Sequence, residues 1–156
     1  AKNMSQVEDF VKEVEGLQEA EEKVLIITGK PGSGKSGVLR EAAAKKAWDY
    51  VDCRLLITED FLELLPALRQ EKAAEMIGEI LEGYNSEVVL LDRLQTLFVP
   101  VFHIDVADLL RKLSKQFVIV AAWPGYCENG CLCYDKFDGT ESIKISADGF
   151  KIWNMD

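Results

Sequence analysis

The stretch VLIITGKPGSGKS, residues 24–36, decides the fold of this chain. Residues 24–28 are apolar except for a final threonine, and they predict a short buried strand. The loop after them, residues 29–36, has the spacing G-x-x-x-x-G-K-[ST], and we expect a helix to follow it up to about residue 46. Strand, glycine-rich loop and helix in this order are typical of a Walker A motif, or P-loop, because glycines let backbone N–H groups surround an anion.

The same loop supplies the candidate nucleotide-binding residues. The helix behind it adds a positive N-terminal end, which favours phosphate. Lys35 is expected to reach the β- and γ-phosphates, and the Ser36 hydroxyl is expected to ligate Mg²⁺. The alternative is a glycine-rich turn that only resembles a P-loop, which the flanking strand and helix disfavour. The expected nucleotide-binding residues are Gly29, Pro31, Gly32, Ser33, Gly34, Lys35, Ser36 and Gly37.

A second motif, VVLLD at residues 88–92, is an apolar strand that ends in an acid, as a Walker B motif does. We expect Asp92 to complete the Mg²⁺ site with Ser36 and to act in catalysis with Lys35. A buried strand that ends in a solvated aspartate is the alternative. The spacing of the motifs leaves room for a strand inserted between their two strands. This arrangement resembles the additional-strand class of P-loop proteins, which includes the AAA+, RecA-like and signal-transduction ATPases.

The rest of the pattern predicts one α/β domain over residues 1–156. Strands alternate with helices and are apolar throughout, so we expect a P-loop NTPase core of the AAA+/RecA-like class, with a mostly parallel sheet, helices on both faces and no helical lid domain. An amphipathic helix within residues 1–21 precedes the core, and a hairpin insertion at 126–135 interrupts it. The other expected strands are 50–54, 117–123 and 142–146, and the other expected helices are 58–84, interrupted near Pro66, and 105–115.

Composition and charge narrow the function classes. At 156 residues, 48% hydrophobic and 29% charged, the chain is typical of a globular protein and unlike a disordered one. Its net charge of −9 disfavours a stand-alone DNA or RNA binder, because nucleic acid is itself a polyanion. No apolar run approaches the roughly 20 residues of a membrane span, and the sequence shows neither a secretory signal nor a disulfide framework. We therefore expect a cytoplasmic protein without membrane contact.

The region after the Walker B strand lacks the usual hydrolytic groups of this class. Many members have a glutamate directly after the Walker B aspartate, whereas this chain has Arg93. Gln95 and Asp52 are the remaining candidates to orient or activate a water molecule. The end of the next strand, residues 121–123, carries no polar sensor, and no arginine follows Arg111 to act late in the chain as an arginine finger. These features predict slow hydrolysis, or hydrolysis that a partner completes.

The order of motifs resembles the small P-loop protein of type III bacteriophage-exclusion (BREX) systems. The resemblance covers most of the chain from about Val24 onward and rests on the Walker A loop and on LLD at 90–92 with LF at 97–98. Its more specific part is VIVAAWPG at 118–125, which runs into an ENG hairpin and LCY. The chain departs from the family in the cysteines of this hairpin and in the DKF after it. The resemblance implies a cytoplasmic bacterial protein that works with other BREX proteins in anti-phage defence.

Three functions remain open at this point. The first is an ATP-binding, weakly hydrolysing subunit that acts as a switch or assembly factor and forms homo-oligomers across its nucleotide site. The second is a small-molecule or nucleotide kinase, because Asp92-Arg93 resembles the Asp-Arg pair of such enzymes. The third is an interaction module with a vestigial nucleotide site. The sequence does not specify the base, and ATP is the default because the guanine-reading pattern N-K-x-D does not occur.

Weaker signals lie outside the two motifs. Cys127, Cys131 and Cys133 place three thiols around one hairpin, which is a zinc hypothesis, although the spacing is unusual and no fourth ligand is evident. Incidental free thiols are the favoured interpretation. We interpret His103 as a loop residue, and Trp123 as a packing residue that could also form a wall of the nucleotide pocket.

Overall fold

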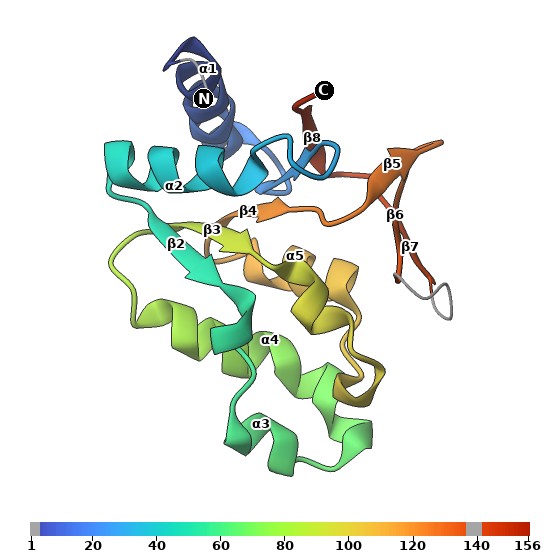
Figure 1. The fold of residues 1–156 in the computed structure, drawn as a ribbon. Helices are drawn as coiled ribbons and strands as arrows, with labels where there is room; N and C mark the ends of the chain where they lie inside the picture. The colour runs from blue at the N-terminus through green and yellow to red at the C-terminus, as the bar shows by residue number, and fades with distance from the viewer. Residues whose placement is uncertain (1–3, 137–141) are drawn as a thin grey trace.

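The computed structural model describes residues 4–136 and 142–156. Its centre is a five-stranded sheet in the order β2–β3–β4–β1–β8, in which every pair of neighbouring strands is parallel (Figure 1). The predicted α/β fold with a mostly parallel sheet is confirmed. The strands of this sheet are β1 (Val24–Thr28), β2 (Asp49–Asp52), β3 (Val88–Asp92), β4 (Val118–Ala122) and β8 (Lys151–Asn154).

One face of the sheet is covered by α1 (Met4–Glu15) and α2 (Lys35–Lys46). Alternate residues of a strand point to opposite faces, so each central strand contributes every second side chain to this layer. Leu25 and Ile27 of β1, for example, pack in the same cluster as Phe10 of α1 and Leu39 of α2. The apolar side of α1 is therefore buried, as the predicted amphipathic pattern requires.

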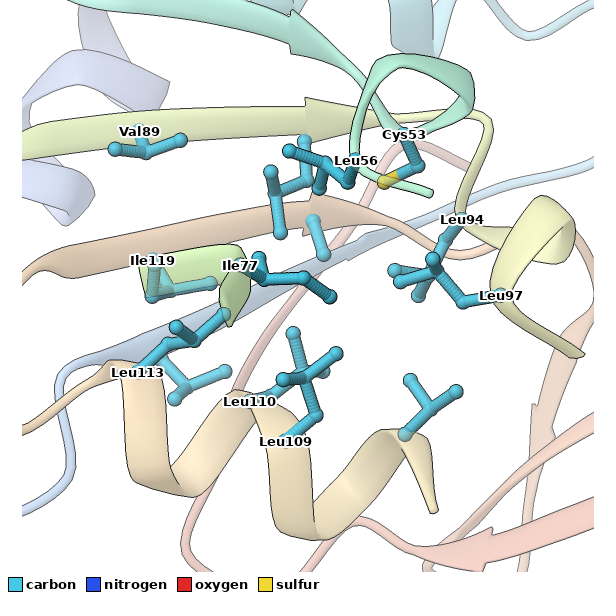
Figure 2. Packing of buried hydrophobic residues seen from close by; sticks show 14 of the residues in the cluster. Cys53, Leu56, Ile77, Val89, Leu94, Leu97, Leu109, Leu110, Leu113 and Ile119 are labelled. Atoms are coloured by element: carbon cyan, nitrogen blue, oxygen red, sulfur yellow. The ribbon is translucent and has the colours of Figure 1, made fainter. Parts of the chain in front are cut away.

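The other face is covered by α4 (Pro66–Glu82) and α5 (Val106–Leu113), with the short α3 (Glu59–Glu63) beside α4. Figure 2 shows this layer: Val89 of β3 and Ile119 of β4 face Leu110 and Leu113 of α5, and Ile77 of α4 lies between them. Helices on both faces explain why the central strands β1, β3 and β4 are buried at every position and almost entirely apolar.

The order of the strands places β4 between β1 and β3, which carry the two motifs. This is the inserted strand expected of the additional-strand class, and it follows both motif strands in the sequence. The strand that lies between the motifs in the sequence, β2, forms the edge of the sheet beside β3. The carboxyl ends of β1, β3 and β4 therefore lie together at one edge, where parallel sheets place their ligand sites.

A second, antiparallel sheet consists of β5 (Tyr126–Glu128), β6 (Cys131–Asp135) and β7 (Ser142–Ser146). Asn129 and Gly130 form the turn between β5 and β6 with φ angles of 52° and 75°, which the two-residue turns of hairpins require. The expected strand at 142–146 is confirmed and pairs with β6. The indole Nε1 of Trp123 donates to the carbonyl oxygen of Cys133 over 2.8 Å and links this sheet to the end of β4.

Several predicted boundaries were wrong. The strand expected at 50–54 ends at Asp52, because the Asp52 side chain accepts a hydrogen bond from the Arg54 N–H and caps a 3₁₀ turn. The first helix ends at Glu15 and continues only as a 3₁₀ helix, and residues 1–3 of its expected range lie outside the described residues. The strand β8 was not predicted at all.

No helix within residues 4–136 and 142–156 combines the length and the apolar character that crossing a bilayer requires.

Candidate functional site

The P-loop connects the end of β1 to the start of α2, as its motif predicts. Gly32 and Gly34 have φ angles of 81° and 99°, which residues with a Cβ atom rarely adopt, so the two glycines allow the loop to close. The Ser33 N–H donates to the Lys30 carbonyl oxygen over 2.9 Å inside the loop. The expected binding residues 29–37 thus lie in one loop and the first turn of α2.

The interior of the loop contains a polar group without a partner. The Ser33 hydroxyl is buried and makes no hydrogen bond with the described residues. A Cβ atom on Gly29 would lie 2.6 Å from this hydroxyl oxygen and 3.1 Å from the Met155 Cβ, so a side chain at position 29 would force the Ser33 side chain to move. Buried polar groups are nearly always paired, and a ligand with oxygen atoms is a suitable partner for this one.

Lys35 lies across the loop. Its ammonium donates to the carbonyl oxygens of Gly29 over 2.6 Å and Lys30 over 3.4 Å, which leaves one of its three N–H groups for another acceptor. Burial lowers the pKa of Lys35 from its usual value, and the carboxylates of Asp156 and Asp92 act in the opposite direction. The negative groups around Lys35 therefore partly offset the cost of burying its charge.

The two motifs meet at a pocket of about 190 Å³. Asp92 is buried at the end of β3, and the N–H of Arg93 donates to its Oδ1 over 2.9 Å. Ser36 and Asp92 both line this pocket, and a serine hydroxyl and a carboxylate are oxygen donors of the kind that Mg²⁺ prefers. The pocket is lined by Lys35, Ser36, Asp92, Arg93, Gln95, Ala122, Trp123 and Pro124.

Tyr50 contacts the Walker B aspartate and was not among the predicted site residues. Its hydroxyl donates to the Asp92 Oδ2 over 2.5 Å, and the Arg40 guanidinium lies over its ring, with Cζ 5.0 Å from the ring centroid. Burial and this hydrogen bond both raise the pKa of the Tyr50 hydroxyl. Tyr50 could have been predicted as a site residue only if the strand order had been known, because β2 must lie beside β3 for Tyr50 to pair with Leu90.

Asp52, a candidate catalytic base, is engaged elsewhere. Its carboxylate accepts hydrogen bonds from the Arg54 side chain at 2.8 to 3.1 Å and lies 3.2 Å from the Nε of Arg93. The Arg54 guanidinium holds the pKa of Asp52 below its usual value. A carboxylate stabilised in this way is a poor proton acceptor. Gln95 lies in the pocket itself and is the better placed of the two candidates.

A second pocket of about 300 Å³ lies beside the first part of the P-loop. The strand β8 brings Asp156 to it: the Met155 N–H donates to the Thr28 carbonyl oxygen over 2.8 Å, and the Lys30 N–H donates to the Asp156 Oδ1 over 3.2 Å. This arrangement was not predicted from the sequence, because it depends on the pairing of β8 with β1. The pocket is lined by residues 28–31 and 124–127 together with Asn154 and Asp156.

The weaker candidates lie apart from the two motifs. Cys127 pairs with Leu132 and so lies on the opposite face of the hairpin from Cys131 and Cys133. Within residues 4–136 and 142–156, no group of three potential ligands could hold a metal ion, so the geometry does not favour the zinc hypothesis. His103 is an exposed loop residue with a φ angle of 55°. Trp123 is fully buried and also lines the smaller pocket.

The comparisons with known proteins add evidence on the fold. No protein-family model matches the chain, and no curated protein sequence matches it. Among solved structures, it is similar to PCH-2 from C. elegans, with a TM-score of 0.51 and 15% sequence identity over 97% of this chain and 43% of that chain.

Two further solved structures match the chain with lower TM-scores. One is a DNA replication initiation factor, with a TM-score of 0.38 and 23% identity, and the other is AMPPCP-bound DnaA from Aquifex aeolicus, with a TM-score of 0.41 and 21% identity. Both alignments cover 73% of this chain and 36% of the other, and their scores are too low to support an argument. The chain spans less than half the length of each of the three structures. The likeness to PCH-2 and the strand order together show an α/β protein with the fold of a P-loop NTPase core.

Proposed function

We propose that this protein binds ATP with Mg²⁺ and, in isolation, hydrolyses it slowly. One observation carries the proposal: Lys35 and Ser36 from the P-loop and Asp92 from β3, which the sequence motifs single out, line the same pocket. These three residues lie at the carboxyl edge of the parallel sheet, and open α/β sheets bind their ligands at this edge.

The residues have distinct roles in this proposal. The backbone N–H groups of residues 29–37 and the Lys35 ammonium hold the phosphates, and Lys35 stabilises the charge that develops on the γ-phosphate. Ser36 and Asp92 hold Mg²⁺, which neutralises phosphate charge when it is bound. Gln95 orients the attacking water molecule. Lys35 and Asp92 are therefore the proposed catalytic residues.

Slow hydrolysis follows from the groups around the pocket. Arg93 lies where many relatives of this class have a glutamate, Asp52 is paired with two arginines, and Ala122 ends β4 without a polar side chain. A complete hydrolytic site would then need a group from another copy of the chain or from a partner. With the resemblance to the BREX family, this supports a cytoplasmic bacterial switch or assembly factor that acts with other BREX proteins in anti-phage defence.

A kinase is the second candidate, and the position of Arg93 favours it. Its side chain is half-exposed and the residue lines the pocket beside Lys35 and Asp92, where a guanidinium could contact a transferred phosphoryl group. Phosphoryl transfer from ATP to any member of a panel of nucleosides and nucleotides would favour this function over hydrolysis.

The test is Mg·ATP binding and hydrolysis by the purified protein and by Lys35→Ala. We expect the wild-type protein to turn over ATP at less than roughly 1 s⁻¹, the lower end of typical kinase rates. Lys35→Ala should lower this hydrolysis rate by about 100-fold or more, because it removes a donor that stabilises charge in the transition state. Lys30→Ala is the matched control, since Lys30 lies in the same loop with an exposed side chain. If the wild-type protein binds no nucleotide, the proposal is contradicted. The remaining hypothesis is then an interaction module with a vestigial nucleotide site.

A further inference from the structure

We propose that Tyr50 is a positioning residue for the magnesium-binding carboxylate: its hydroxyl holds Asp92 in the orientation in which Asp92 and Ser36 share one metal ion. This inference rests on the proposed Mg²⁺-dependent binding of ATP and adds a residue that neither sequence motif contains.

The first argument is the way in which the carboxylate is held. The Tyr50 hydroxyl donates to Oδ2 over 2.5 Å, and the Arg93 N–H donates to Oδ1 over 2.9 Å. Two donors on different oxygens fix the rotation of the carboxylate about its last bond. Each carboxylate oxygen can accept two partners, so both oxygens of Asp92 keep a position for a metal ion or its water ligands.

The second argument is that two further contacts hold Tyr50 itself. Its backbone pairs with Leu90 in the parallel ladder of β2 and β3, which places its side chain on the same face as Asp92. The Arg40 guanidinium lies over the ring of Tyr50, with Cζ 5.0 Å from the ring centroid. Arg40 follows Ser36 by four residues in α2, so it lies one turn further along the same face of the helix.

These contacts connect the two elements that would share the metal. The helix α2 carries Ser36, the strand β3 carries Asp92, and Tyr50 touches both through Arg40 and through the carboxylate. A residue that donates a hydrogen bond to a metal ligand helps to orient that ligand. Removing such a residue typically lowers metal affinity by about 10- to 100-fold. Among the side chains of the described residues, Tyr50 donates the hydrogen bond that the Asp92 carboxylate accepts.

The experiment compares wild type with Tyr50→Phe, which removes one oxygen atom. Mn²⁺ is the metal probe, and its binding to the ATP-loaded protein is followed by electron paramagnetic resonance. We expect the Mn²⁺ affinity of Tyr50→Phe to fall by about 10-fold or more. ATP affinity measured in EDTA should stay unchanged, because the P-loop is intact. Tyr84→Phe, altered just after α4 and outside the pocket, is the matched control and should match wild type in both measurements.

The outcomes separate this proposal from the proposed function. A Tyr50→Phe protein with unchanged Mn²⁺ affinity overturns it, and so does one with raised affinity, since Tyr50 would then compete with the metal. A wild-type protein that binds ATP equally well with and without metal overturns it while nucleotide binding stands. A wild-type protein that binds no nucleotide overturns both. A misfolded Tyr50→Phe protein overturns this proposal as well, because the role of Tyr50 would then be structural.

Discussion

The two sheets of this protein are stabilised in different ways. Every residue of β1, β3 and β4 in the parallel sheet is buried, whereas all of β5 is exposed and β7 alternates between exposed and half-buried positions. The parallel sheet thus depends on apolar packing against helices on both faces, and the antiparallel sheet on its backbone ladder and on one covered face. Of the proposed catalytic residues, Asp92 ends a strand of the parallel sheet and Lys35 begins the helix that follows β1. Of the two pockets described above, the one of about 300 Å³ is also lined by Tyr126 and Cys127 of the antiparallel sheet.

The largest expected difference comes from shortening one apolar side chain in each sheet. Leu90→Ala in β3 should lower the free energy of unfolding by about 2 to 5 kcal/mol, because Leu90 is fully buried and a cavity remains. Ile143→Ala in β7 should cost about 1 kcal/mol, because Ile143 is only partly buried. Urea denaturation of both variants measures the difference, and equal losses would contradict the comparison.

The junction between the sheets is the next most sensitive place. A Cβ atom on Gly125 would lie 1.9 Å from the carbonyl oxygen of Cys133, which belongs to the backbone of β6 and cannot move aside alone. Gly125→Ala should therefore shift the antiparallel sheet and destabilise the protein by about 1 to 3 kcal/mol. The thermal melting temperature measures this, with Gly16→Ala as control, since a Cβ atom there would contact nothing within 4 Å.

Trp123→Phe should weaken the same junction. The change removes the hydrogen bond from the indole to the Cys133 carbonyl oxygen, whose net contribution is about 0.5 to 1.5 kcal/mol, and the smaller ring leaves a space in the core that adds to this loss. Hydrogen exchange should become faster in β6 while β1 and β3 remain protected, because the lost hydrogen bond attaches β6 to the end of β4. Equal acceleration in both sheets would show that they unfold as one unit.

The smallest expected effect is a pH dependence at the edge of the parallel sheet. The pKa of Asp52 is lowered by Arg54, so its ion pairs stabilise the protein above the usual aspartate pKa of about 3.9, and this contribution is lost as the pH falls through the folded-state pKa. Asp52→Asn should be slightly less stable than wild type at pH 7, by less than about 1 kcal/mol because the pair is partly exposed. The gap should close as the pH falls below 4, and a constant gap would contradict the assignment.

The sequence allowed the parallel core and the P-loop to be predicted because both depend on local patterns. Residues 24–36 and 88–92 contain complete apolar strands and complete motifs, so no distant contact is needed to interpret them. The strand β8 could not be predicted in this way, since it has four residues with a lysine and an asparagine, and only its pairing with β1 makes it a strand. Tyr50 was missed for the same reason, because its contact with Asp92 depends on which strands are neighbours.

The order of the strands also has a consequence for biosynthesis. The ribosome makes β1 and the P-loop early, yet both neighbours of β1 in the sheet come late: Val24 pairs with Ile119 and Leu25 pairs with Lys151. A nascent chain therefore carries the complete Walker A motif long before the motif has a sheet to support it. Contacts so distant in sequence form slowly and leave apolar strands exposed meanwhile. We expect the candidate site to take shape only after β4 and β8 have been made, although the Walker A sequence emerges before both.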